Sequence, residues 1–130
     1  MNPEIARLQA DYAALCRRLG ATGAPLADSL TDDGGAHIEI YGNEYHYVTT
    51  ERGKEYERRI THDRDEALYW FVSDRVFTLA SDYELHSRDE TKDGWRIIFA
   101  KEVERMGQLS AAWAVRKQGE IDVILARRRT

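Results

Sequence analysis

One uninterrupted stretch, residues 63–86, constrains the fold of this chain more than any other. It reads DRDEALYWFVSDRVFTLASDYELH and contains neither proline nor glycine. Its apolar residues recur in steps of three and four, which places them on one face of a helix. Aromatic residues widen this face, so we expect the helix to pack against more than one neighbouring element. The face comprises Leu68, Val72, Val76, Leu79, Ala80 and Tyr83, widened by Trp70, Phe71 and Phe77.

The first residues of this stretch carry signals for the start of a helix. Asp63 and Glu66 have the spacing of a capping box, with aspartate in place of the usual serine or threonine. Asp65 adds negative charge where the helix dipole favours it. The helix is therefore expected to begin directly after Asp63.

The size and charge of the chain limit what it can bind. A chain of 130 residues, 42% of them hydrophobic, is expected to form a single domain over residues 1–130. Its 19 basic and 23 acidic residues give a net charge of −4, whereas proteins that bind nucleic acid usually have a basic excess. The single cysteine, Cys16, excludes an internal disulfide, and no apolar run approaches the roughly 18 residues of a membrane span. We therefore expect a cytoplasmic protein with neither a nucleic-acid nor a membrane partner.

Charge is unevenly distributed along the second half of the chain. Residues 61–93 hold 9 acidic and 4 basic residues, a balance of −5, whereas residues 94–130 hold 4 and 8, a balance of +4. The simpler interpretation, which we favour, is that the acidic and basic segments pair with each other. The alternative is that the acidic segment presents a face to a basic partner.

Residues 36–60 carry the clearest strand signal. Two runs of alternating apolar and polar residues flank Gly42-Asn43, which has the composition of a two-residue hairpin turn with glycine at positive φ. In that register one face collects apolar residues and the other collects polar and aromatic ones, as a hairpin with one buried face requires. The predicted pairs are Tyr41 with Glu44, Ile40 with Tyr45, Glu39 with His46, and Ile38 with Tyr47.

The remaining segments complete an α+β fold. Residues 3–19, preceded by Asn2 as N-cap, have helical periodicity, and Gly53 marks a second turn that leads into a third strand. Residues 95–113 predict another long helix, and Gly119 is expected to break the chain before a short last helix. We therefore expect an N-terminal helix, a three-stranded antiparallel β-meander, two long helices and a short C-terminal helix, with the helices packed on one face of the sheet.

Two histidines raise the question of catalysis or metal binding. His37 and His46 fall on the polar face of the hairpin with Glu39 and Glu44 beside them, and two histidines with a carboxylate can bind a metal. We favour the simpler interpretation that these are exposed residues of a solvated strand face. The chain has no phosphate-binding loop and no motif of the serine hydrolases, zinc proteases or dithiol redox proteins. We therefore expect neither catalysis nor a cofactor.

Two aspartates of the central helix, Asp74 and Asp82, lie among large apolar side chains. A carboxylate that faces inward must be paired. We expect such a pair to be structural, tying the sheet or the last helix to the central helix, rather than to mark a functional acid. The candidate partners are Arg58, Arg59 and Arg96.

Three stretches together carry a family resemblance. They are IEIYGNEYHYVTTERGKEYERRIT, DRDEALYWFVSDRVFTLASDYE and a later pattern formed by Phe99, Lys101, Leu109 and Trp113. With these features the segment from residue 38 to residue 113, more than half of the chain, resembles the immunity protein 63 family of bacterial polymorphic toxin systems. The segment 94–96 departs from the paired-arginine pattern of that family.

The resemblance implies a small protein that binds and neutralises a cognate toxin domain, in a stoichiometric complex and without a cofactor. A polar, aromatic sheet face suits such a binder, because tyrosine supplies contact area at low entropic cost and acidic groups steer a basic toxin on encounter. The candidate toxin-binding residues are Glu39, Tyr41, Glu44, His46, Asp63, Asp65 and Glu66.

Two other classes of function remain open. A small metal-dependent or hydrolytic enzyme would use the outer hairpin face, and stoichiometric metal in the purified protein would favour it. An adaptor domain would bind another protein of the same cell, and the absence of a neighbouring toxin gene would favour that class.

Overall fold

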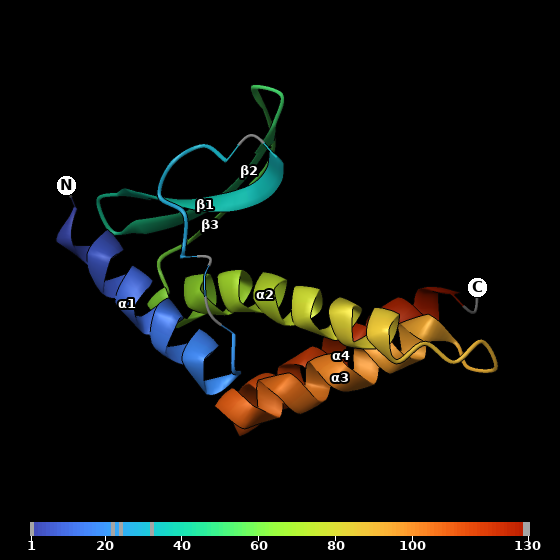
Figure 1. The fold of residues 1–130 in the computed structure, drawn as a ribbon. Helices are drawn as coiled ribbons and strands as arrows, with labels where there is room; N and C mark the ends of the chain where they lie inside the picture. Colours follow the sequence, from blue (N-terminus) through green and yellow to red (C-terminus); the bar gives the residue numbers. More distant parts are fainter. Residues whose placement is uncertain (1, 22, 24, 32, 129–130) are drawn as a thin grey trace. The chain divides into compact units, whose positions relative to one another are not determined.

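Four helices and three strands make up the part of the chain that the computed structural model describes, residues 2–128 without 22, 24 and 32 (Figure 1). Their order and type confirm the α+β class. Contacts divide the chain into two compact units, residues 1–73 and 74–130, and the boundary falls within the central helix. The elements are α1 (Pro3–Arg18), β1 (Asp33–Tyr41), β2 (Glu44–Glu51), β3 (Lys54–Thr61), α2 (Arg64–His86), α3 (Gly94–Leu109) and α4 (Ala111–Arg128).

The three strands form one antiparallel sheet in the order β1-β2-β3. The first connection is the predicted turn, and Gly42 has a φ of +61°, in the left-handed region that glycine adopts without strain. Because two-residue turns leave no freedom in strand pairing, the turn determines the register of the hairpin. All four predicted pairs are present: Tyr41 with Glu44, Ile40 with Tyr45, Glu39 with His46, and Ile38 with Tyr47.

The second connection, Arg52-Gly53, is also a two-residue turn, with both residues at positive φ. Close to it the pairing of β2 with β3 shifts by one residue between Thr49 and Thr50, as in a β-bulge. Because of this shift, Val48 lies opposite Arg58 and shares its face of the sheet. The shift decides which side chains of β3 join the polar face.

In the N-terminal unit the apolar face of the sheet packs against the first half of α2. The Tyr47 ring lies 5.0 Å from the Phe71 ring and 6.2 Å from the Trp70 ring, between centroids. The guanidinium of Arg59 lies 4.1 Å from the Tyr47 centroid and adds a cation–π contact. The buried apolar residues of this unit include Leu8, Tyr12, Cys16, Ile38, Tyr47, Leu68, Tyr69, Phe71 and Val72.

Helix α1 is capped as predicted and is tied to the rest of the N-terminal unit by polar contacts. The side chain of Asn2 accepts a hydrogen bond from the backbone N–H of Glu4 at 2.9 Å. The Glu4 carboxylate accepts in turn from the Tyr45 hydroxyl at 2.7 Å, and Arg64 of α2 pairs with Asp11 at 2.7 Å. These bonds connect α1 to the sheet and to the start of α2.

In the C-terminal unit the break between the last two helices differs from the predicted one. Helices α3 and α4 lie side by side and antiparallel (Figure 1), and the break between them falls at Ser110, whereas α4 runs unbroken through Gly119. Ser110 is extended, and its Oγ accepts a hydrogen bond from the backbone N–H of Trp113 at 3.2 Å. The expectation of a short last helix is therefore wrong, because a serine cap starts a helix more effectively than one interior glycine ends it.

None of the helices among the described residues is long and apolar enough to span a membrane.

Replacing Gly119 by alanine is expected to raise the free energy of unfolding by about 0.5–1 kcal/mol, because glycine inside a helix costs that much relative to alanine. A Cβ built at Gly119 has no neighbouring atom within 4 Å, so the added methyl group causes no clash. Urea denaturation measures the difference. Gly42→Ala is the matched contrast, and it should destabilise the protein because φ is +61° there.

Candidate functional site

The polar face of the sheet contains a hydrogen-bond network centred on Glu39. One carboxylate oxygen, Oε2, accepts from Nε2 of His37 at 2.7 Å. The other, Oε1, accepts from the Tyr41 hydroxyl at 2.6 Å and from the Arg58 guanidinium at 3.1 Å. Side chains two residues apart on one strand share a face, so β1 supplies the carboxylate and two of its donors, and β3 supplies the third. Three donors converge on one carboxylate and hold it in one position.

Arg58 joins this network to His46. Its Nη1 lies 2.8 Å from Nδ1 of His46, and because a guanidinium only donates, that nitrogen must accept. The ring is therefore neutral with its proton on Nε2, from which it donates to Glu44 Oε1 at 3.1 Å. Arg58 also pairs with Glu55 at 2.7 Å. One basic side chain thus connects polar groups of all three strands, Glu39 of β1, His46 of β2 and Glu55 of β3.

The electrostatics of the face follow from these contacts. Burial alone would raise the pKa of Glu39, but hydrogen bonds from Tyr41, His37 and Arg58 outweigh it and lower the pKa from 4.5 to about 2. The same bond raises the pKa of Tyr41, because ionising the phenol would remove the donor and place two anions together. The hydrogen bond to Glu55, followed by that to Glu39, raises the pKa of Arg58. Glu39 is ionised and Tyr41 protonated at neutral pH.

The exposure of this face differs from the solvated strand face that we expected. His37 and His46 are both buried, and each forms hydrogen bonds with longer side chains of the same face. Tyr41 is 57% exposed, its ring set edge-on against the ring of His46 at 4.9 Å between centroids. The side chain of Glu44 is 41% exposed and that of Glu39 is 25% exposed. Tyr41, Glu55 and Glu44 are therefore the parts of the network that solvent or a partner can reach most readily.

The acidic start of α2 lies at the end of the sheet that carries Tyr41 and Glu44. Nδ1 of His62, directly after β3, donates to the backbone carbonyl of Asn43 in the first turn at 3.2 Å. Asp63 follows and caps α2 by accepting from the backbone N–H of Asp65 at 2.9 Å. Both aspartates are exposed, and Glu66 is half-buried. The candidate residues at the hairpin and at the helix start therefore belong to neighbouring parts of one unit.

The arginines proposed as partners of Asp74 and Asp82 make other ion pairs. Both aspartates are exposed, so neither is the buried carboxylate for which a partner was required. Arg58 pairs with Glu39 and Glu55, Arg59 with Glu57 at 3.3 Å, and Arg96 with Asp93 at 3.8 Å.

The histidines are not arranged as metal ligands. Both ring nitrogens of His46 are used in hydrogen bonds, to Arg58 and to Glu44, which leaves no free lone pair. Nε2 of His37 donates to Glu39. In residues 2–128, as far as they are described, no three His, Cys, Asp or Glu side chains converge as a metal site would require.

One family match emerges from comparison with known proteins. The model of the family described as Immunity protein 63 matches residues 42–123, well over half of the chain. This segment includes β2, β3, α2, α3 and most of α4. No curated protein and no solved structure matches the chain.

Proposed function

The chain belongs to the immunity protein 63 family, and on that premise we propose that it binds a cognate bacterial toxin domain and neutralises it by forming a stoichiometric complex. The family match carries this proposal. We further propose that the toxin contacts the polar face of the sheet and the adjoining start of α2, directly through Tyr41, Glu44, Asp63, Asp65 and Glu66, with Glu39 and His46 holding Tyr41 in place.

Preorganisation of the polar face supports this choice of surface. An exposed side chain that is already held in one conformation loses less entropy on binding than a free one. The hydroxyl of Tyr41 is bonded to Glu39, and its ring rests against buried His46. Tyrosine is also one of the residue types that most often dominate binding energy at interfaces. Tyr41 is therefore the proposed anchor, whereas Glu39 and His46 position it from below.

Charge supports a basic toxin surface as the partner. Glu39, Glu44 and Glu55 carry three negative charges on this face, against one positive charge on Arg58, and both aspartates at the start of α2 are exposed. Acidic side chains accelerate association with a basic partner and disfavour association with an acidic partner. The face therefore selects for a toxin with lysine or arginine at its contact surface.

The first test of the proposal is co-expression with the toxin domain encoded immediately upstream, with growth and co-purification as readouts. Restored growth and a one-to-one complex are the expected result. Continued growth arrest without a complex, although the chain is folded by circular dichroism, would falsify the immunity proposal.

A charge reversal tests the proposed face. Glu44→Lys should slow association with the toxin by roughly tenfold at low salt, and the difference should shrink as salt is added. Glu44 suits this purpose because it is a partly exposed acid at the edge of the network. Glu90→Lys is the matched control, since Glu90 is exposed in the connection after α2 and its reversal changes the net charge by the same amount. Equal association rates for both variants would exclude this face.

A further inference from the structure

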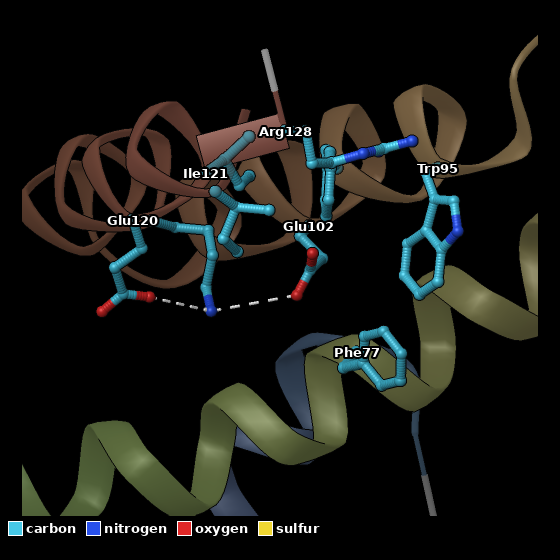
Figure 2. A pocket seen from close by; sticks show the side chains of 9 residues that line it. Phe77, Trp95, Glu102, Glu120, Ile121 and Arg128 are labelled. Atoms are coloured by element: carbon cyan, nitrogen blue, oxygen red, sulfur yellow. Dashed lines mark ion pairs between the residues drawn. The ribbon is translucent and has the colours of Figure 1, made fainter. Parts of the chain in front are cut away.

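The C-terminal unit contains a cavity that the proposed toxin-binding face does not use. It has a volume of about 480 Å³, within the range of ligand sites, and lies among α3, α4 and the second half of α2 (Figure 2). Phe77 and Trp95 stack across it with ring centroids 6.4 Å apart, and Phe99 lies 5.8 Å from Trp95. Ile121 and Ile124 of α4 complete the apolar wall. Phe77, Trp95 and Ile124 are each between 42% and 48% exposed, so this wall is only partly covered within the unit.

One wall of the cavity carries a buried carboxylate that lacks hydrogen bonds. Glu102 is only 5% exposed, and no hydrogen bond to its carboxylate occurs among the described residues. Its one ionic neighbour is Lys117, whose Nζ lies 3.8 Å away, too far for a hydrogen bond. The same Nζ lies 3.1 Å from Glu120, and dashed lines in Figure 2 mark its ion pairs with Glu102 and Glu120. The Glu102 carboxylate lines the cavity, so a donor that enters the cavity can reach it.

The charges around the cavity favour a cation as that donor. Glu120 pairs with both Lys117 at 3.1 Å and Arg116 at 3.4 Å, so Glu102 is the acid of this wall whose nearest cation stays distant, at 3.8 Å, while Arg128 lies exposed at the end of α4, where solvent screens it. Burial raises the pKa of Glu102 and Lys117 lowers it in part. A second cation beside Glu102 would supply the hydrogen bond that Lys117, at 3.8 Å, does not make.

We infer that this cavity receives an arginine or lysine side chain of the toxin, with its aliphatic stem along the aromatic wall and its cationic head on the Glu102 carboxylate. Trp95 and Phe99 are suited to this role, because aromatic faces attract cations and pack well against methylene groups. Arginine is the stronger candidate, since its planar guanidinium can donate two hydrogen bonds to one carboxylate. The inference rests on the proposed function and adds a second contact, separate from the sheet face.

The chain alone allows a first test, because Trp95 is one of only three tryptophans. Titration of the ¹⁵N-labelled chain with N-acetyl-arginine amide should shift the Trp95 indole N–H signal saturably, and the signals of Trp70 and Trp113 should stay in place. N-acetyl-norleucine amide, which lacks the cation, should bind at least tenfold more weakly. A Trp95→Phe variant assigns the signal. Equal affinity for the two probes, or no saturable shift of Trp95, would overturn the inference.

Glu102→Gln provides the second test. It keeps the size of the side chain but removes its charge, and it should weaken binding of the arginine probe by roughly tenfold. Lowering the pH through the raised pKa of Glu102 should likewise weaken binding of the arginine probe to the wild-type chain, since the cation binds the ionised form of Glu102. Glu104→Gln is the matched control on the exposed side of α3 and should leave the affinity unchanged.

The same variants in complex with the toxin separate this inference from the proposed function. Glu102→Gln should weaken toxin affinity by roughly tenfold, whereas Glu104→Gln should not. If Glu102→Gln binds the toxin as tightly as the wild type, the cavity is not a toxin contact, but the immunity proposal stands. If the wild-type chain binds no toxin, both proposals are overturned.

Discussion

Replacing Glu39 by glutamine is expected to lower the free energy of unfolding at neutral pH by about 3 kcal/mol. The reason is the downward shift of the Glu39 pKa, from 4.5 to about 2, which measures how much the folded state favours the ionised form. Each pKa unit corresponds to about 1.4 kcal/mol. Glutamine keeps the shape but loses the charge that attracts Arg58 and binds the donors of His37 and Tyr41.

The pH dependence of this loss has a definite sign. The folded pKa lies below the unfolded one, so ionised Glu39 stabilises the protein fully above about pH 4.5 and progressively less as the pH falls towards 2. The difference between wild type and Glu39→Gln should therefore be largest at neutral pH and vanish near pH 2. Urea denaturation at several pH values measures it. Glu90→Gln, at an exposed acid, is the control that should stay near wild type, and equal stability of Glu39→Gln at pH 7 would contradict the role of the network.

The β1-β2 hairpin could be predicted from the sequence because its register depends on local turn chemistry. Gly42 accepts positive φ in a two-residue turn, and the alternation of the flanking runs then assigns every side chain to a face. The start of α2 was predictable for a similar reason, since an Asp63 side chain caps whichever helix follows it. Both signals lie within a few residues of the feature they determine.

The centre of the network could not be predicted, because it depends on a register shift that the sequence does not mark. If β2 and β3 paired regularly from the second turn onward, Tyr47 would lie opposite Arg58, and Arg58 would be on the apolar face. The shift between Thr49 and Thr50 instead pairs Tyr47 with Arg59 and moves Arg58 to the polar face. One inserted residue thus exchanges the roles of two adjacent arginines. Arg59 stacks on Tyr47, while Arg58 connects Glu39, Glu55 and His46.

The cavity of the C-terminal unit was missed for a different reason. Glu102 and Lys117 are charged residues of amphipathic helices, and in a sequence such residues are usually assigned to a solvated face. Their burial arises only because α3 ends at Ser110 and α4 folds back along it, which brings the two side chains together. A single helix running through Ser110 would keep Glu102 and Lys117 apart. The break at Ser110 is therefore part of what forms this cavity.

The largest effect expected on toxin binding is that of Tyr41→Ala, which should weaken affinity by roughly 30-fold, about 2 kcal/mol, as for an aromatic anchor at the centre of an interface. Tyr41 is exposed over more than half of its surface, yet it is fixed by its hydroxyl bond to Glu39 and by ring contact with His46. Titration calorimetry with the toxin domain measures the loss.

Two further variants assign that effect to the ring. Tyr41→Phe keeps the ring but breaks the bond to Glu39, so it should lose only a small part of the affinity while lowering stability. Tyr56→Ala removes a tyrosine of similar exposure from β3, near the second turn at the opposite end of the sheet, and should bind as the wild type does. If Tyr56→Ala weakens binding as much as Tyr41→Ala, the toxin covers the whole sheet. If Tyr41→Ala has no effect, Tyr41 is not the anchor, and the cavity lined by Trp95 and Glu102 becomes the first surface on which to look for the toxin.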